Sequence, residues 1–377
     1  MKPILPGAML GVLGGGQLGR MFTQAAQQMG YCVTILDPAE DCPAGNVADD
    51  HICADFTDSS ALQRLMSQCE AITTEFENVP AESLRRLAKN RVVSPDAQSV
   101  FIAQNRVTEK QFLTNNGFTV ASFAVITRQL DLDDEDIDYF LPGILKASQF
   151  GYDGKGQKIV HHRDELQAAY TQLNQPICVL EKFMPLKCEI SVVVARNADG
   201  TVATFPPAEN QHVDGILDIS IVPARIAPEL AQRAREMACQ VVGALQYQGV
   251  LCVEFFVLQD DELLINEIAP RPHNSGHYSI NACITSQFEQ QVRTLCGMPL
   301  GDTTQHSAAV MVNLLGDLWH RGEPDWSRVL RHPTAKLHLY GKKEARQGRK
   351  MGHYTVLASD IASALHDALD IKKQLNH

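Results

Sequence analysis

The chain has 377 residues, a length that predicts about two or three domains at ~150 residues each. Hydrophobic residues make up 45% of it and charged residues 20%, which is typical of a globular protein with enough apolar material for a core. The net charge of -11 argues against a protein that binds nucleic acid non-specifically, because such proteins carry a basic face. A small anionic substrate is not excluded, since local basic clusters can work inside an acidic protein.

The 10 cysteines never form a C-x-x-C motif, so the sequence lacks both a zinc ribbon and a thioredoxin-type motif. The apolar residues 1–16 run directly into a glycine-rich turn without a cleavage site, which predicts a first strand and not a signal peptide. No uninterrupted apolar run reaches the ~18 residues of a membrane span. We therefore expect a cytoplasmic protein with reduced, mostly buried thiols.

A glycine-rich turn, GVLGGGQLGR, lies in the first regular region of the chain. Gly14, Gly16 and Gly19 form G-x-G-x-x-G and Asp37 follows, which matches the dinucleotide-binding fingerprint. Around this turn the runs MLGVLG, YCVTILD, HICAD, AITTEFE and RVVSP predict strands, and QLGRMFTQAAQQMG and SSALQRLMSQC predict helices. The alternation predicts a small doubly wound parallel sheet up to about Pro95, with too few strands for a complete dinucleotide fold.

The rest of the chain changes character twice. A helix (TEKQFLTNNGF) and an acidic stretch at 130–138, interpreted as a solvated loop, lead into a strand-rich region at 142–270. Its predicted strands are GILKAS, QKIVHH, ICVLEKF, EISVVVARN, TVATFPP, VLCVEFFVL and ELLINEIA, and its two clear helices lie around 164–173 and 229–246. The final segment, 301–377, contains the strand-like runs SAAVMVNLLG and KLHLYGK and a closing helix, ASDIASALHDALDIKKQL.

A second glycine-rich stretch, GYDGKGQ at 151–157, follows Lys146 between two predicted strands. It is therefore predicted to lie at a hairpin tip and not at the strand-to-helix turn of a Walker-type loop. Such a hairpin can close over a polyphosphate and donate backbone N–H groups and Lys155 to it. A plain turn, with glycines at positive φ, explains the stretch equally well.

The strand-rich region carries several carboxylates on or between its predicted strands. Glu181 and Glu189 flank a loop between two predicted strands, where they either line an adenosine pocket or are two surface carboxylates. Glu254 lies on one later strand, and Asn266 and Glu267 lie on the next, so antiparallel pairing would bring the two carboxylates to one face. Hard oxygen ligands on such a face suit Mg²⁺ shared with substrate phosphates. The alternative is an ion pair with Arg271 or with a lysine.

Two further motifs, RPHNSGH at 271–277 and GRKMGH at 348–353, gather basic and amide side chains among glycines. Both are predicted to be loops, where convergent polar groups are more often functional than they are in a core. For GRKMGH a solvated basic turn is as reasonable an interpretation as a phosphate site.

Taken together and in this order, six motifs resemble the ATP-grasp ligases over nearly the entire chain, and within them the 5-(carboxyamino)imidazole ribonucleotide synthase family. These motifs are GGGQLGRM, TTEFENVP, FGYDGKGQ, ENQHVDGIL, NEIAPRPHNSGH and LYGKKEARQGRKMGH. The resemblance implies an α/β protein with an ATP-grasp fold, an N-terminal parallel-sheet (Rossmann-like, pre-ATP-grasp) domain and a small C-terminal domain. The implied ranges are 1–98 for the pre-ATP-grasp domain, 99–178 for the small ATP-grasp subdomain with its lid, 179–300 for the large subdomain, and 301–377 for the C-terminal domain packing with it.

The resemblance also implies an activity. The family converts 5-aminoimidazole ribonucleotide, bicarbonate and ATP into the N5-carboxylated nucleotide, ADP and phosphate in de novo purine biosynthesis. Bicarbonate would attack the γ-phosphate in line to give carboxyphosphate, and the imidazole amine would then be carboxylated. The implied cofactors are ATP and Mg²⁺, and the implied partners are small-molecule substrates and a second copy of the chain, with no nucleic acid and no membrane.

Site residues follow from the same resemblance, position by position. The implied ATP contacts are Arg106, Lys146, Gly151, Tyr152, Asp153, Gly154, Lys155, Gly156, Gln157, Glu181, Lys182, Phe183, Met184, Glu189, His212, Asn266 and Glu267. Mg²⁺ would be held by Glu254 and Glu267. The ribonucleotide would meet Gly16, Gln17, Leu18, Glu75, Asn274, Lys342, Arg349 and Lys350, with its phosphate at the glycine turn because a helix N-terminus binds any phosphate. The candidate catalytic residues are Arg271 and His273, which would orient bicarbonate, and Asp153 and Tyr152, the former to manage a proton.

The sequence departs from the family pattern at two positions. Ala269 stands where many ATP-grasp chains carry Asn, and Phe150 stands where glycine is common. Three other functions are considered beside the carboxylating ligase: a formate-dependent ribonucleotide transformylase of the same fold, a nicotinamide-dependent oxidoreductase and a non-catalytic nucleotide sensor. The low strand count before residue 100 disfavours the oxidoreductase, and the presence of both metal carboxylates and both phosphate-binding lysines disfavours the sensor.

Overall fold

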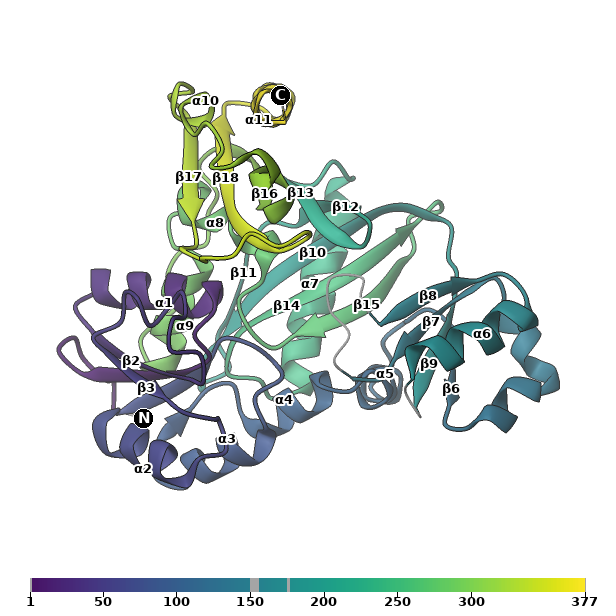
Figure 1. The fold of residues 1–377 in the computed structure, drawn as a ribbon, viewed down its shortest axis with the longest axis horizontal. Helices are drawn as coiled ribbons and strands as arrows, with labels where there is room; N and C mark the ends of the chain where they lie inside the picture. Colours follow the sequence, from purple (N-terminus) through teal and green to yellow (C-terminus); the bar gives the residue numbers. More distant parts are fainter. Residues whose placement is uncertain (1, 150–155, 175–176, 377) are drawn as a thin grey trace.

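The computed structural model describes residues 2–149, 156–174 and 177–376, and their strands form three sheets (Figure 1). The described helices are α1 (Gln17–Gln28), α2 (Ser59–Gln68), α3 (Ala81–Ala88), α4 (Ala97–Ala103), α5 (Arg106–Asn115), α6 (Arg163–Leu173), α7 (Pro228–Ala244), α8 (Ser279–Ala282), α9 (Gln287–Leu295), α10 (Ser327–Leu330) and α11 (Ile361–Leu375). Within this described part of the chain, no helix is long and apolar enough to cross a bilayer.

The N-terminal sheet is parallel and has the strand order β3-β2-β1-β4-β5. Its strands are β1 (Met9–Leu13), β2 (Cys32–Asp37), β3 (Asp50–Cys53), β4 (Ala71–Thr74) and β5 (Val92–Val93). All five strands and both helices expected here are confirmed, and α3 is an addition. The strand order reverses at β1 and β4, and open parallel sheets bind their ligands at the carboxyl ends of the strands beside such a reversal.

The largest sheet has nine strands in the order β15-β14-β10-β12-β13-β16-β18-β17, with β11 paired to β10. Its strands are β10 (Leu186–Arg196), β11 (Val202–Thr204), β12 (Ala208–Val213), β13 (Ile216–Val222), β14 (Gly249–Leu258), β15 (Leu263–Ala269), β16 (Ala308–Leu315), β17 (Ala335–Leu339) and β18 (Lys350–Ala358). Because β13 pairs with β16, one sheet continues across the boundary expected between residues 300 and 301.

A four-stranded sheet forms a separate unit that projects at the right of Figure 1. Its order is β6-β9-β7-β8, with β6 (Phe123–Ile126), β7 (Gly143–Ala147), β8 (Gln157–Val160) and β9 (Cys178–Lys182). The acidic stretch beside this sheet was expected to be a solvated loop, which is wrong. It forms two 3-10 helices, Gln129–Asp133 and Glu135–Phe140, because Leu132 and Ile137 are buried and anchor it to the core of this unit.

Two corrections concern strands with polar residues. The segment ENQHVDGIL forms β12 and β13, which the sequence analysis did not predict as strands. The motif GRKMGH is only partly a loop, because β18 begins at Lys350 and continues through His353. The run ILDISIV of β13 alternates apolar and polar residues, which is itself a strand signal that the sequence analysis did not use.

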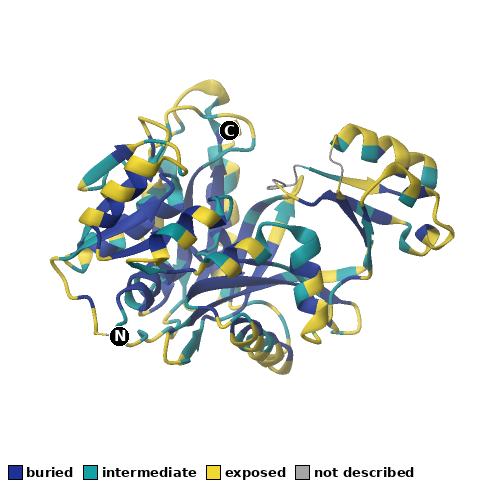
Figure 2. Ribbon diagram, turned by 90° about the horizontal axis from the view of Figure 1, so that it is seen from below, coloured by how far each residue is buried: buried dark blue, intermediate teal, exposed yellow. Residues whose placement is uncertain are grey.

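The N-terminal sheet shares its core with the rest of the molecule. One apolar cluster contains Leu10 and Val12 of β1, Phe288 and Val292 of α9, and Tyr340 after β17. Figure 2 shows buried segments running through the body of the molecule, with exposed residues on its outer helices. The parallel sheet therefore packs against the rest of the molecule through α9 and Tyr340.

We predict that Phe288→Ala destabilises this shared core. Phe288 is 1% exposed, and truncation of a buried phenylalanine typically costs roughly 3–5 kcal/mol through lost burial and an unfilled cavity. Urea unfolding followed by circular dichroism measures the loss. Leu369→Ala serves as the control, because Leu369 is 44% exposed and its truncation should change stability by at most ~0.5 kcal/mol. Equal effects of the two variants would contradict the shared core.

Candidate functional site

Two carboxylates face each other across β14 and β15. Glu254 pairs directly with Glu267 in the antiparallel ladder, as the sequence predicted. The register then shifts, because Phe255 pairs with Ile265, and Asn266 is the extra residue of a β-bulge. Bulges of this kind re-aim side chains and recur beside active sites.

Each of these carboxylates has a cationic neighbour. Arg106 at the start of α5 lies 3.0 Å from Glu267, and His273 Nε2 lies 2.9 Å from Glu254. Burial would raise the pKa of Glu254, but the adjacent His273 lowers it to about 2. Among the residues that the structure describes, neither Arg271 nor a lysine, the alternative partners expected from the sequence, forms an ion pair with these two side chains.

The donor set fits a magnesium ion. The side-chain oxygen Oδ1 of Asn266 is buried without a hydrogen-bond partner, beside the bulge that carries Glu267. No group of three His, Cys, Asp or Glu side chains within the described ranges could hold a metal ion by itself. Mg²⁺ is commonly bound by one or two carboxylates together with substrate phosphates and water, so two carboxylates and an amide oxygen suit it.

A third carboxylate, that of Glu181, is buried and pairs with two lysines. Glu181 on β9 lies 2.8 Å from the Lys146 ammonium and 3.4 Å from that of Lys110, and all three side chains are almost fully buried. Burial would raise the pKa of Glu181, but the two lysines lower it to about 2. Lys110 was missed by the sequence analysis, although it lies in the predicted helix TEKQFLTNNGF. The observed helix α5 begins earlier, at Arg106, so the two residues lie four positions apart on one face.

The other expected nucleotide contacts line up along neighbouring strands. Glu189 on β10 lies 3.3 Å from His212 Nδ1 on β12, so the two side chains form a pair in the nine-stranded sheet. Between β9 and β10, Phe183 is exposed, and Met184 packs on a small apolar cluster. This segment therefore leaves one aromatic side chain accessible beside Lys182 at the end of β9.

The glycine hairpin is described only in part. Residues 151–155, including Tyr152 and Asp153, lie outside the described residues, as does Phe150. Gly156 accepts a hydrogen bond from the Ala147 amide (2.8 Å), and Gln157 pairs with Lys146, so β7 and β8 form the expected hairpin arms.

The glycine turn after β1 is occupied by carboxylates of the protein. Gly16 N–H and Gly19 N–H donate to Glu75 (2.5 and 2.8 Å), and Gly15 N–H donates to Asp37 (2.7 Å). Burial raises the pKa of Glu75. These amides were expected to hold a phosphate, but in this structure they donate to two acidic side chains, which a phosphate would have to displace.

Basic residues of the C-terminal segment lie near the glycine turn and its Glu75. The Lys342 ammonium donates to the backbone oxygen of Lys350 (2.6 Å) and lies close enough to Glu75 to counteract the rise in its pKa. Lys350 in turn neighbours Glu254 and helps to lower the pKa of that carboxyl. Arg349 donates to the backbone oxygen of Glu344 (2.8 Å). The C-terminal strands thus bring two cations between the glycine turn and the carboxylate pair.

Two predicted ribonucleotide contacts have other roles in this structure. Asn274 is buried and forms a reciprocal amide pair with Asn313 (3.0 and 2.7 Å), so its side chain links two segments of the chain. Leu18 is 8% exposed and belongs to the shared apolar core, which leaves only its backbone for a ligand. Gln17 begins α1 and is partly exposed.

An ion pair joins the N-terminal domain to the loop after β15. Arg271 donates to Glu77 through Nε (2.5 Å) and Nη2 (3.3 Å). Burial would raise the pKa of Glu77, but Arg271 lowers it to about 2. Glu77 was not among the predicted site residues, although it lies in the motif TTEFENVP.

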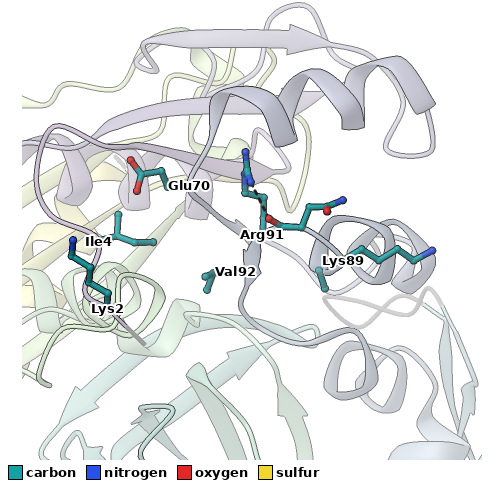
Figure 3. Close-up of a pocket in the computed structure, with 8 residues that line it drawn as sticks. Lys2, Ile4, Glu70, Lys89, Arg91 and Val92 are labelled. Atoms are coloured by element: carbon teal, nitrogen blue, oxygen red, sulfur yellow. Dashed lines mark hydrogen bonds between the residues drawn. The ribbon is translucent and has the colours of Figure 1, made fainter.

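A cavity of about 60 Å³ lies where these groups meet. Its lining includes Glu77 and Gln104 from the N-terminal part of the chain, Arg106 and Glu109 from α5, and Glu267 and Arg271 from β15 and the loop that follows. A larger, separate hollow of about 660 Å³ lies by the starts of β4 and β5, and Figure 3 shows Glu70, Arg91 and Val92 among its lining residues. It contains none of the predicted site residues.

Comparison with known proteins agrees with this arrangement. Three family models match the chain: a ribonucleotide synthetase preATP-grasp domain over residues 8–104, an ATP-grasp domain over 111–288, and a phosphoribosylaminoimidazole carboxylase C-terminal domain over 309–367. The chain is 43% identical over 354 residues to the N5-carboxyaminoimidazole ribonucleotide synthase of Bacillus subtilis (strain 168), covering 94% of this chain and 92% of the relative.

Solved structures of such enzymes superpose closely on this one. The ADP complex of an N5-carboxyaminoimidazole ribonucleotide synthetase has a TM-score of 0.93 at 42% identity, covering 99% of this chain and 98% of that one. The Aspergillus clavatus enzyme in complex with ADP and 5-aminoimidazole ribonucleotide has a TM-score of 0.90 at 30% identity, covering 98% of both chains. On this evidence the chain belongs to the N5-carboxyaminoimidazole ribonucleotide synthase family of ATP-grasp ligases.

Proposed function

We propose that this chain carboxylates 5-aminoimidazole ribonucleotide, with ATP and bicarbonate as co-substrates, for purine biosynthesis. The observation that carries the proposal is the cavity in which Arg106 and Glu267, on the nucleotide side, meet Arg271 and Glu77, which lies two residues after Glu75. A reaction that passes a reactive intermediate from ATP to an acceptor needs both groups of residues at one enclosed place.

The nucleotide side would act by positioning and by charge. Arg106 and Lys146 would contact ATP phosphates, and Glu189 with His212 would hold the ribose region. Glu254, Glu267 and Asn266 would hold Mg²⁺, which when bound neutralises phosphate charge. Bicarbonate oxygen would then displace ADP from the γ-phosphorus, giving carboxyphosphate.

Arg271 and His273 were both expected to orient bicarbonate, but we assign that role to Arg271 alone. Both ring nitrogens of His273 are committed, Nε2 to Glu254 (2.9 Å) and Nδ1 to Ser275 Oγ (2.8 Å). Burial would lower the pKa of His273, but the neighbouring Cys252 and Glu254 raise it to about 10. His273 therefore positions Glu254, and Arg271, held in the cavity by Glu77, is the group that would orient bicarbonate.

The acceptor would bind with its ribose, and not its phosphate, at the glycine turn. Glu75, fixed at the N-terminus of α1, accepts hydrogen bonds, which suits ribose hydroxyls and not a phosphate. The ribonucleotide phosphate would instead meet the cations of the C-terminal segment, Lys342, Lys350 and Arg349. The exocyclic amine would then attack the carboxyl carbon of carboxyphosphate, or CO₂ released from it, and phosphate would leave.

The occupied glycine turn also bears on the other candidate functions. A dinucleotide pyrophosphate needs the amides that Glu75 and Asp37 already occupy, which disfavours the oxidoreductase. The domain ranges, the homodimer, the cytoplasmic location and the roles of Tyr152 and Asp153 stay predictions.

An ADP-release assay tests the proposed reaction. Turnover is expected only when ATP, bicarbonate and 5-aminoimidazole ribonucleotide are all present. Formate in place of bicarbonate should give no stimulation, and NAD should have no effect. Turnover stimulated by formate and independent of bicarbonate would support the transformylase and contradict the proposal.

The metal assignment predicts that Glu267→Gln abolishes ATP turnover while the fold is retained. The substitution keeps the shape of the side chain but removes the charge that a hard cation prefers. Turnover at saturating Mg²⁺ and thermal unfolding are the two measurements. Near-normal turnover in a folded variant would show that Glu267 is not a metal ligand.

The acceptor assignment predicts that Gly16→Ala weakens ribonucleotide binding and spares ADP binding. A Cβ at Gly16 would lie 2.4 Å from Glu75 Oε1, so the carboxylate must move. Loss of such a charge-assisted contact is worth about 1.5–3 kcal/mol, or roughly 10- to 100-fold in affinity. Isothermal titration with each ligand measures it. Gly243→Ala is the control, since nothing beyond its own turn of helix α7 lies within 4 Å of the added methyl, and equal loss in both variants would refute the assignment.

A further inference from the structure

Helix α5 presents an acid and a base to the backbone on either side of Glu267. The Glu109 carboxylate accepts a hydrogen bond from the Ile268 amide (2.6 Å), and the Lys110 ammonium donates to the Asn266 carbonyl (2.9 Å). Glu109 is 2% exposed and Lys110 is fully buried. Neither residue was predicted from the sequence to belong to the site.

These backbone groups have an unusual need for partners. β15 is the last strand of its sheet in the described part of the chain, so its outer edge faces no other strand at these residues. The bulge at Asn266 also interrupts the ladder to β14. Buried backbone groups must be hydrogen-bonded, and here two side chains from a helix take the place of a neighbouring strand.

The helix face that carries Glu109 and Lys110 also contacts the side chain of Glu267. Arg106, one turn earlier, pairs with the carboxylate of Glu267 (3.0 Å). Three charged groups of α5 therefore contact residues 266–268: one binds the carbonyl before Glu267, one its carboxylate and one the amide after it. A freely moving bulge would let Glu267, which lines the cavity, turn away from it and would leave Asn266 without a fixed orientation.

We propose that Glu109 and Lys110 are positioning residues that hold this bulge and so aim Asn266 and Glu267 at the nucleotide-bound metal. The inference rests on the proposed role of Glu267 as a metal ligand. Glu109 acts here through its oxygen as an acceptor and Lys110 through its ammonium as a donor. Partners of this kind around metal ligands commonly control metal affinity by about 10- to 100-fold.

The test uses Glu109→Ala and Glu109→Gln in the full-length protein. Titration calorimetry with ADP, with and without Mg²⁺, reads out the metal site without turnover. Glu109→Ala is expected to weaken ADP binding about tenfold or more in the presence of Mg²⁺ and to leave metal-free ADP binding unchanged. Glu109→Gln should restore the Mg²⁺ effect, because its amide oxygen can accept the same N–H.

A matched control separates positioning from general stability. Gln290 is also fully buried, and its amide satisfies both backbone groups of Gly301 (2.6 and 3.0 Å) on another part of the fold. Gln290→Ala should lower the unfolding temperature without changing the dependence of ADP binding on Mg²⁺. If Glu109→Ala does not fold, Lys110→Met tests the other end of the bulge. Because Lys110 also pairs with Glu181, its removal is expected to weaken metal-free ADP binding as well, so the loss is scored as the ratio of the ADP affinities with and without Mg²⁺.

Three results would overturn the inference. The first is an unchanged Mg²⁺ effect in folded Glu109→Ala, or in Lys110→Met where that variant replaces it. The second is a Glu109→Gln variant that is as impaired as Glu109→Ala, because this would indicate that the negative charge of Glu109 is needed. The third is a Gln290→Ala variant that loses the Mg²⁺ effect to the same extent. Failure of the proposed metal-ligand role of Glu267 is distinguishable, because it would appear as a normal Mg²⁺ effect in Glu267→Gln, and failure of the proposed reaction would appear in the ADP-release assay.

Discussion

Charge that is withdrawn from water must be paired, and this requirement ties the parts of the molecule to one another. Leaving one member of a buried pair alone typically costs about 3–5 kcal/mol. Glu77 of the N-terminal domain pairs with Arg271 after β15, and Arg106 of α5 pairs with Glu267. Each of these pairs crosses between structural units, so the charges of the site also fix how those units meet.

The same pairing organises the nucleotide side before any ligand is considered. Glu181 holds Lys110 and Lys146 together in a buried position, where two adjacent cations alone would repel each other. Lys110 then reaches the backbone of β15, which links the four-stranded sheet to the strand that carries Glu267. The cations that are suited to phosphate are thus preorganised by carboxylates, and electrostatic catalysis benefits from groups that need not reorganise.

The glycine turn shows how a fingerprint can be present while its usual ligand is excluded. The backbone does form a turn at the N-terminus of α1, and its amides point outward as the pattern predicts. Glu75 and Asp37 accept those hydrogen bonds, so the positive end of the helix binds carboxylates of the chain itself. A helix N-terminus favours any anion, and here the fold supplies that anion from acidic side chains of the chain and not from a ligand.

The sequence alone was enough to determine the order of most strands and helices, the pairing of Glu254 with Glu267, and the family, because these depend on local periodicity and on motifs in a fixed order. It could not determine what each polar group contacts. Glu77 and Arg271 are 194 residues apart, and Lys110 meets a carbonyl 156 residues away. Asn274 was expected at a ligand but pairs with Asn313, and the amides of the glycine turn were expected to be free. Only the packing of the three sheets decides such neighbours, since hydrogen bonds and ion pairs act over a few ångströms in space and not along the chain.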